Sequence, residues 1–120
     1  MRNDQTLEAW RNSMPLVEDI YGMSKEFPTK ERYGLHPISR AAVSVPANIA
    51  EEMGRQYKRD TLQFLHITRG SACELDTLLR IACSLQFLSD NAYDKLRSLL
   101  DDIGRLLNGL INYVQKAALK

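Results

Sequence analysis

Residues His36–Arg55, HPISRAAVSVPANIAEEMGR, have an unusual distribution of polar side chains. When it is drawn as an α-helix with about 100° per residue, its larger polar side chains share one arc of roughly 80°. These side chains are Arg40, Ser44, Asn48, Glu51 and Arg55, and nearly all other positions are small or apolar. A helix that is apolar on most sides is usually buried on most sides. The pattern therefore predicts that other helices, and other subunits, pack around this one.

The composition is that of one globular domain. The sequence has 120 residues, of which 44% are hydrophobic and 26% are charged, and its net charge is +1. A chain of this length can bury a core as one domain. The near-neutral charge gives no overall attraction to nucleic acid or acidic lipid, so binding to such partners depends on local patches or on an assembly.

The N-terminus and the cysteines predict a cytoplasmic protein. Residues 1–10, MRNDQTLEAW, contain no apolar signal core, and the sequence has no apolar run of about 18 residues for a membrane span. Cys73 and Cys83 lie ten residues apart in one predicted helix, so about 15 Å separates them and they cannot form a disulfide. Two reduced cysteines without zinc-ligand spacing are typical of the cytoplasm.

Apolar residues recur at intervals of three and four throughout the chain, which predicts helices and almost no strands. We expect helices over residues 5–26, 37–54 and 59–87 and from Ser89 or Asp90 into the tail, joined by short links. Pro46 inside the second helix predicts a kink. Short links make neighbouring helices antiparallel, so the predicted fold is an all-α, antiparallel up-and-down four-helix bundle.

Three of these helices carry apolar stripes that we expect to pack inside the bundle. In the first helix the stripe is Leu7, Trp10, Met14, Val17, Tyr21 and Ser24, and in the fourth it is Leu96, Leu100, Ile103, Leu107, Leu110 and Val114. The third helix carries one stripe of Leu65, Thr68, Ala72, Leu75, Leu79 and Ala82 and a second of Phe64, Ile67, Ser71, Glu74, Leu78, Ile81 and Leu85. Two adjacent stripes on one helix predict two neighbours to pack against.

The sequence contains no pattern that predicts catalysis, a cofactor or a metal. Di-iron bundles need Glu-x-x-His pairs, whereas Gln63 precedes His66 and Tyr33 precedes His36 by three residues. His66 is expected on the outside of the third helix. Phosphate-binding loops, nucleophile elbows and dinucleotide-binding glycine motifs are also absent. We therefore expect a protein that is not an enzyme and that binds no cofactor.

Polar residues interrupt the second stripe of the third helix and predict a buried polar network. Ser71 and Glu74 follow Gly70, and a glycine costs about 1 kcal/mol relative to alanine in a helix interior. We expect another backbone to approach Gly70, and Glu74 to pair with an arginine because a buried carboxylate without a partner is very costly. The predicted network consists of Arg40, Ser44, Asn48, Glu51, Arg69 and Glu74, with Arg55 as the alternative partner of Glu74. In a second interpretation, the polar arc faces a ligand or nucleic acid in the assembled protein.

Basic residues gather in the two links beside the second helix. The first link contains Lys25, Lys30 and Arg32, and the second contains Arg55, Lys58 and Arg59. In an up-and-down bundle these links lie at opposite ends, so one subunit has two small patches that are ordinary for solvated links. A ring would repeat one patch around its rim and bind phosphates multivalently. The candidate nucleic-acid-binding residues are Arg32, Arg55, Lys58 and Arg59.

Four motifs together resemble a known bacterial family. They are Leu7-x-x-Trp10, Phe27-Pro28-x-x-Glu31-Arg32-Tyr33-Gly34-Leu35, Arg40-Ala41-Ala42-Val43-Ser44-Val45-Pro46-Ala47-Asn48-Ile49-Ala50-Glu51 and Arg69-Gly70-Ser71-x-x-Glu74-Leu75. With these motifs the chain resembles the four-helix-bundle family named for proteins encoded in intervening sequences of bacterial 23S rRNA genes. That family is similar to the accessory proteins of diversity-generating retroelements, which form basic pentameric barrels that engage a reverse transcriptase and nucleic acid. The resemblance thus implies a homopentamer, an association with RNA or other nucleic acid, and no catalytic activity.

The residues and the resemblance together predict a ring of bundles. We expect the subunits to meet through the apolar flank of the second helix and parts of the first or third helix. The expected function is a non-enzymatic oligomeric scaffold that binds RNA. The alternative is an adaptor that binds a protein such as a reverse transcriptase, through the groove between subunits instead of phosphate contacts. A small-molecule or metal enzyme that uses Glu74 and Arg40 ranks last.

Overall fold

The computed structural model describes residues 4–31, 35, 37–54 and 61–118. The elements are α1 (Asp4–Ser24), the short 3-10 helix η1 (Thr29–Glu31), α2 (Pro37–Gly54), α3 (Thr61–Ser84) and α4 (Asp90–Ala118). Four α-helices and no strand therefore make up the described part of the chain, which confirms the predicted all-α class. No helix in it combines the length and the apolar character that crossing a membrane requires.

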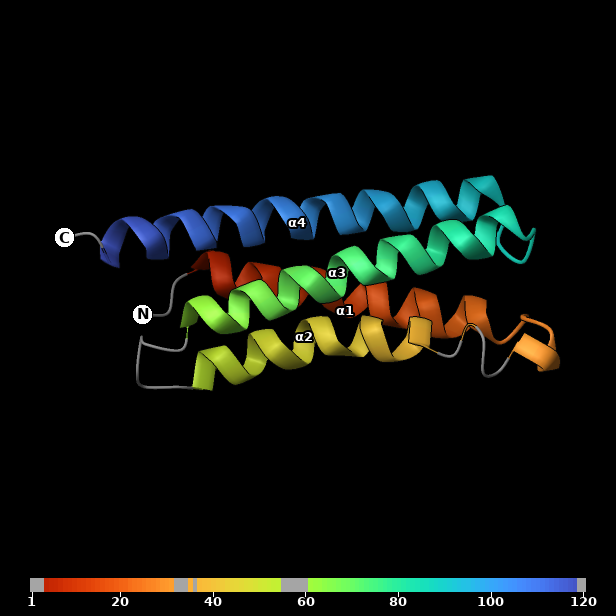
Figure 1. Cartoon of the computed structure of the whole chain (residues 1–120), viewed down its shortest axis with the longest axis horizontal. Helices are drawn as coiled ribbons and strands as arrows, with labels where there is room; N and C mark the ends of the chain where they lie inside the picture. The colour runs from red at the N-terminus through yellow and green to blue at the C-terminus, as the bar shows by residue number, and fades with distance from the viewer. Residues whose placement is uncertain (1–3, 32–34, 36, 55–60, 119–120) are drawn as a thin grey trace.

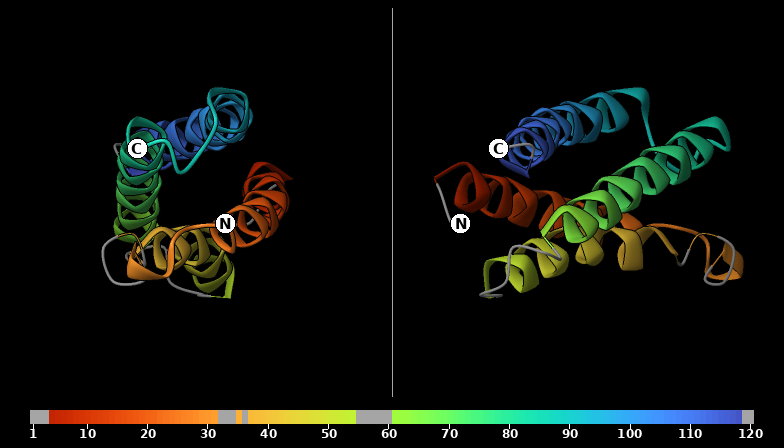
Figure 2. Two further views of the ribbon diagram at one scale, coloured as in Figure 1. Left: turned by 90° about the vertical axis from the view of Figure 1, so that its right-hand side faces the viewer. Right: turned by 60° about the vertical axis from the view of Figure 1, so that its left-hand side comes forward.

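The four α-helices lie side by side along the longest dimension of the molecule, whose extents are 51 × 23 × 20 Å (Figure 1). In Figure 1 the chain runs one way through α1 and α3 and the opposite way through α2 and α4. α1 packs against α2 and α4, and α3 packs against the same two helices. The left view of Figure 2, along the bundle, shows α2 with α1 on one side and α3 on the other. α4 lies diagonally opposite α2.

The cores of α3 and α4 agree with the predicted stripes. All six residues of the first α3 stripe are buried, and so are five of the six residues of the α4 stripe, with Val114 half-buried. Leu75, Leu79, Ile103 and Leu107 have no exposed surface. The second α3 stripe differs, because Ile67, Glu74, Ile81 and Leu85 are exposed and only its other members are half-buried.

The predicted core stripe of α1 is wrong at three of its positions, while its members Trp10 and Val17 are half-buried and pack against the core. The buried residues are Thr6, Ala9, Ser13, Leu16 and Ile20, whereas Leu7, Met14 and Tyr21 are exposed. Both sets repeat at three and four and lie one residue apart, or about 100° around the helix, so periodicity alone cannot choose between them. The polar Ser13 is satisfied inside the helix, because its hydroxyl donates to the Trp10 carbonyl oxygen at 2.7 Å.

α2 is a continuous helix through Pro46, and its burial is less complete than predicted. Its buried residues are Ile38, Ala41, Ala42, Val45, Pro46, Ile49 and Glu52. The apolar Val43, Ala47 and Ala50 are exposed on its outer side. The kink at Pro46 stays a prediction.

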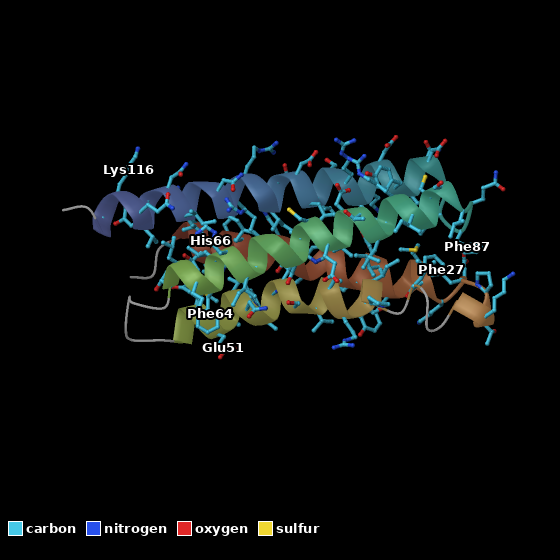
Figure 3. All side chains as sticks on the ribbon, viewed as in Figure 1. Phe27, Glu51, Phe64, His66, Phe87 and Lys116 are labelled. Atoms are coloured by element: carbon cyan, nitrogen blue, oxygen red, sulfur yellow. The ribbon has the colours of Figure 1, made fainter. Side chains whose placement is uncertain are left out.

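The turn between α3 and α4 is held by backbone and side-chain hydrogen bonds. Gln86 has a φ of 66°, and the N–H groups of Gln86 and Phe87 donate to the carbonyl oxygens of Cys83 and Ala82 at 3.0 and 2.9 Å. This is a Schellman ending for α3 with Gln86 at the left-handed position. Ser89 Oγ accepts the N–H of Ala92 at 3.1 Å and so caps α4, as predicted. Nearby, the rings of Phe27 and Phe87 lie 6.1 Å apart and close this end of the bundle (Figure 3).

Candidate functional site

One part of the predicted polar network joins α2 to α3. The hydroxyl oxygens of Ser44 and Ser71 lie 2.8 Å apart, at hydrogen-bond distance. Asn48 Nδ2 donates to both the carbonyl oxygen and the Oγ of Ser44, at 2.8 and 2.9 Å. All three side chains are half-buried. Ser44 and Asn48 are thus brought together as predicted, and their partner on α3 is Ser71.

The buried pairing of Arg40 with Glu74 is absent from the described part of the chain, and Arg55, the alternative partner of Glu74, lies outside the described residues. Arg40, Glu51 and Glu74 are all exposed, and no ion pair joins Arg40 to Glu74 within the described ranges. Glu74 precedes the fully buried Leu75, and one residue turns a helical side chain by about 100°, which places Glu74 on the outer side. A Cβ atom at Gly70 would have no described atom within 4 Å, so the backbone expected to approach Gly70 does not belong to this part of the chain.

Arg69 belongs to the other side of α3, which faces α4. Its Nη1 donates to Asn108 Oδ1 at 3.1 Å, and its Nη2 lies 3.2 Å from His66 Nδ1. His66 is exposed, as the sequence predicts. No group of histidine, cysteine, aspartate or glutamate residues that could hold a metal ion occurs among the residues that the structure describes.

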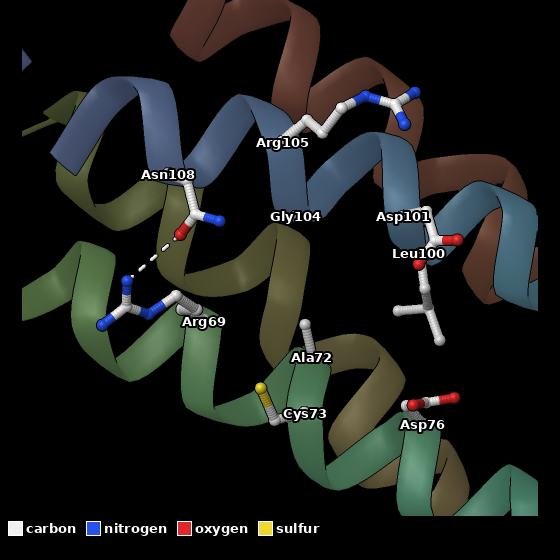
Figure 4. A pocket seen from close by; sticks show the side chains of 9 residues that line it. All are labelled: Arg69, Ala72, Cys73, Asp76, Leu100, Asp101, Gly104, Arg105 and Asn108. Carbon is white, nitrogen blue, oxygen red and sulfur yellow. Dashed lines mark hydrogen bonds between the residues drawn. The ribbon is translucent and has the colours of Figure 1, made fainter. Parts of the chain in front are cut away.

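A groove of about 390 Å³ lies between α3 and α4, beside Arg69 (Figure 4). Its lining residues are Arg69, Ala72, Cys73, Asp76, Leu100, Asp101, Gly104, Arg105 and Asn108. The bonded pair of Arg69 and Asn108 lies at one end, and Asp76 and Asp101 lie toward the other. Two arginines and two aspartates leave the groove without net charge. Sequence reasoning missed this groove, because its walls come from segments far apart along the chain and no local motif marks it.

Asp76 connects the groove to the α3–α4 turn. Its Oδ1 accepts the Tyr93 hydroxyl at 3.0 Å, and its Oδ2 accepts Arg80 Nε at 3.2 Å. Burial, and then the hydrogen bond to Asp76, raise the pKa of Tyr93. Cys83 Sγ donates to Asp90 Oδ1 at 3.2 Å, and this bond, followed by burial, raises the pKa of the Cys83 thiol. The thiol is therefore kept protonated, which disfavours nucleophilic chemistry at Cys83.

The four residues predicted to bind nucleic acid, Arg32, Arg55, Lys58 and Arg59, lie outside the described residues. The described cations of the first link are Lys25, which follows α1, and Lys30 in η1, and both are exposed. The structure thus places two cations of the first link in solvent.

Exposed apolar side chains form two rows on the outside of the bundle. We call Leu7, Met14 and Tyr21 of α1, together with Val43 of α2, the α1/α2 row, and Ile67, Ile81 and Leu85 the α3 row. These side chains are between 36% and 51% exposed. A large patch of exposed apolar side chains often marks an interaction site. The residues of the α3 row belong to the second apolar stripe of α3, so the sequence already indicated this surface. The α1 residues of the other row were instead predicted to lie in the core.

A family model covers almost all of these elements. The model of the 23S rRNA-intervening sequence protein matches residues 5–109, which include α2, α3, nearly all of α1 and most of α4. The chain belongs to the 23S rRNA-intervening sequence protein family. This finding confirms the resemblance carried by the sequence motifs. No curated protein matches the chain.

A solved structure shares the fold of this member of the 23S rRNA-intervening sequence protein family. It is the crystal structure, at 1.70 Å resolution, of a protein with unknown function from the S23 ribosomal protein family of Bacteroides thetaiotaomicron VPI-5482. The two structures agree with a TM-score of 0.83 at 20% sequence identity, and the match covers 90% of this chain and 98% of that chain. The four-helix arrangement is therefore kept at low sequence identity.

Proposed function

We propose that this member of the 23S rRNA-intervening sequence protein family is a non-enzymatic subunit of a cytoplasmic homo-oligomeric scaffold. In this proposal, antiparallel up-and-down bundles assemble into a ring, a homopentamer, that binds RNA or other nucleic acid. Each subunit contributes Arg32, Arg55, Lys58 and Arg59 to the binding surface. The observation that carries the proposal is the exposure of the α1/α2 row and the α3 row.

The energy available from these rows supports assembly. Complete burial of a large apolar side chain is worth about 1.5–3 kcal/mol. Each side chain in the rows keeps roughly 40% of its surface in solvent, so covering it contributes about 1 kcal/mol. Seven such side chains supply a gain comparable with the cost of holding two subunits together, once flanking contacts are added.

A non-enzymatic role is supported by how the polar side chains are used. Asp76 is engaged by Tyr93 and Arg80, and Arg69 is engaged by Asn108 and His66. Glu74 and Arg40, the pair considered for an enzyme, are exposed on the outer surface.

Repetition of the basic links supports nucleic-acid binding in the assembly. One subunit has a net charge of only +1, so a single chain attracts a phosphate backbone weakly. A ring presents the same small patch several times, and the second and later contacts form at high effective concentration. Affinity then depends on assembly as well as on the arginines and lysines.

Sedimentation velocity tests the assembly. At micromolar concentration we expect one species whose mass is a multiple of 13.7 kDa, with five subunits as the proposed number. A stable monomer under these conditions would remove the ring, and with it the multivalent mode of binding.

Binding of a structured RNA hairpin, followed by fluorescence anisotropy between 50 and 200 mM salt, tests the RNA role. We expect affinity to fall steeply with salt, and Lys58→Gln with Arg59→Gln to weaken binding and flatten the salt dependence. The matched control is Arg97→Gln with Lys116→Gln, which removes two exposed cations from α4 and should leave binding unchanged. A flat salt response, or no binding at low salt, contradicts the RNA role; an intact oligomer without RNA binding favours the protein-binding adaptor.

A further inference from the structure

One end of the groove between α3 and α4 carries a positive charge with only neutral partners. Arg69 is half-buried there, and its guanidinium is held by Asn108 Oδ1 at 3.1 Å and His66 Nδ1 at 3.2 Å. Among the residues that the structure describes, no carboxylate forms an ion pair with Arg69. A guanidinium has five N–H donors in a planar fork, and these two bonds use only two of them. Arg69 therefore offers an oriented charge and further donors to an anion.

The opposite end of the groove is acidic, because Asp76 and Asp101 lie there (Figure 4). Both carboxylate oxygens of Asp76 are already engaged by hydrogen bonds. Asp101 is exposed, and it forms no ion pair with another described residue. Arg105 also lines the groove, but its guanidinium donates to Asp102. The charges that lack a counterion are thus positive at one end of the groove and negative at the other.

The helices set the distance between these two ends. Arg69 and Asp76 are seven residues apart on α3, and Asp101 and Asn108 are seven residues apart on α4. At 1.5 Å per residue, each pair is separated by about 10 Å along its helix. A ligand that reaches both ends therefore has its own opposite charges about 10 Å apart.

The middle of the groove is small and apolar. Ala72 and Leu100 are buried there, and Gly104 between the two ends has no side chain to fill the space. The groove volume of about 390 Å³ lies within the range of about 300–1,000 Å³ that is usual for ligand pockets. The part of the ligand between its charges therefore has small apolar groups.

We propose that the α3–α4 groove binds a short zwitterionic peptide, with its C-terminal carboxylate at Arg69 and its N-terminal ammonium group at Asp101. An extended peptide spans about 3.3–3.6 Å per residue, so three residues place the two termini about 10 Å apart. A polyanion fits less well, because its further charges would meet the two aspartates. None of the groove residues belongs to the α1/α2 row or the α3 row, so this site is separate from the apolar surfaces of the proposed assembly.

Four forms of trialanine separate the contributions of the two charges. Free trialanine carries both charges, N-acetyl-trialanine carries only the carboxylate, trialanine amide carries only the ammonium group, and the doubly blocked form carries neither. Each form is titrated into the ¹⁵N-labelled protein at about pH 6.5, below the α-amino pKa of about 7.7–8.0. The NMR signals of the Gly104 and Asn108 amides report binding in the groove. We expect free trialanine to bind most tightly, and the loss of either charge to weaken binding about tenfold, or about 1.4 kcal/mol.

Charge-removing variants assign the two ends. Arg69→Gln should weaken binding of the two forms with a free carboxylate and not of trialanine amide, and Asp101→Asn should weaken binding of the two forms with a free ammonium group and not of N-acetyl-trialanine. A variant that only loosened the bundle would affect every form alike. Lys116→Gln and Asp94→Asn are the matched controls, because they remove exposed charges of α4 outside the groove. Asn108→Asp, at an exposed position, is a second variant for the positive end, since its carboxylate competes for Arg69.

Alkylation by iodoacetamide reads the same groove independently. Cys73 is exposed and lines the groove, whereas Cys83 is not among its lining residues. Saturating trialanine should slow the alkylation of Cys73, followed by peptide mass spectrometry, and leave that of Cys83 unchanged. The proposal is overturned if the doubly blocked form binds as tightly as trialanine, if the Gly104 and Asn108 signals do not move, or if Cys73 stays unprotected. It is also overturned if the two charge-removing variants weaken all forms equally.

Discussion

Replacing Tyr93 by phenylalanine should remove one hydrogen bond between α4 and α3 while leaving the aromatic ring in place. The lost bond is the one from the Tyr93 hydroxyl to Asp76 Oδ1, at 3.0 Å. Hydrogen bonds to charged groups contribute about 1.5–3 kcal/mol when they are well shielded. The Asp76 side chain is 31% exposed and keeps its bond to Arg80, so solvent replaces part of the loss. We therefore expect a destabilisation of about 1 kcal/mol, or about 4 °C in Tm for a chain of this length.

The same substitution predicts a pH dependence with a definite sign. Burial, followed by the hydrogen bond to Asp76, raises the pKa of Tyr93 in the folded protein. A raised pKa means that the folded state holds the hydroxyl proton more tightly than the unfolded chain does. The stabilisation is therefore complete below the ordinary tyrosine pKa of about 10 and is lost as the pH rises through the folded-state pKa. The difference in stability between the unmodified chain and Tyr93→Phe should shrink above about pH 10.

Urea and thermal unfolding, followed by far-ultraviolet circular dichroism at one protein concentration, measure both effects. Tyr113→Phe removes a hydroxyl from a half-exposed tyrosine on the same helix and should shift neither the urea midpoint nor Tm. The reasoning is refuted if Tyr93→Phe and Tyr113→Phe unfold together at pH 7, or if the loss caused by Tyr93→Phe grows in alkaline solution.

Two further substitutions test other parts of the interpretation. Gln86→Gly should stabilise the chain by about 0.5–1 kcal/mol. The φ of 66° at this position is strained for a residue with a Cβ atom but is favourable for glycine. An unchanged or lower urea midpoint would argue against this. Glu74→Gln should change the unfolding free energy by less than about 0.5 kcal/mol, since Glu74 is exposed in the single chain. A loss of several kcal/mol in urea unfolding would instead restore the buried ionic network.

The sequence predicted the helices and half of the core because periodicity is a local property. In α4 the predicted seam from Leu96 to Leu110 is the buried face. In α1 the stripe through Leu7 and Met14 is more hydrophobic than the buried one through Ala9 and Ser13, so a ranking by hydrophobicity selects the stripe that is only partly buried. Close helix packing favours the smaller side chains, and this depends on neighbours that a single helix does not reveal.

The site was harder to predict because its contacts join distant residues. Arg69 was assigned to the network around Glu74, yet its partner is Asn108, 39 residues away on α4. Ser44 was expected to belong to the polar network around the Glu74 carboxylate, whereas its hydrogen-bond partner is the hydroxyl of Ser71. Glu52, an acid beside the exposed Glu51, is buried, and nothing in the local pattern separates the two. The rotation of each helix relative to its neighbours decides such pairings. Drawing one helix at a time from the sequence does not reveal this rotation.

The contrast between α2 and α4 orients the proposed assembly. The exposed positions of α4 include Asp94, Lys95, Arg97, Asp101 and Arg105, which are charged and costly to remove from water. On α2 the exposed positions include the apolar Val43, Ala47 and Ala50, which lose little when they are covered, as well as the charged Arg40 and Glu51. The two helices lie diagonally across the bundle, so burying the flanks of α2 leaves the outer face of α4 in solvent. The groove beside Arg69 and Arg105 lies between α3 and α4, so the proposed burial of the flanks of α2 does not require it to be covered.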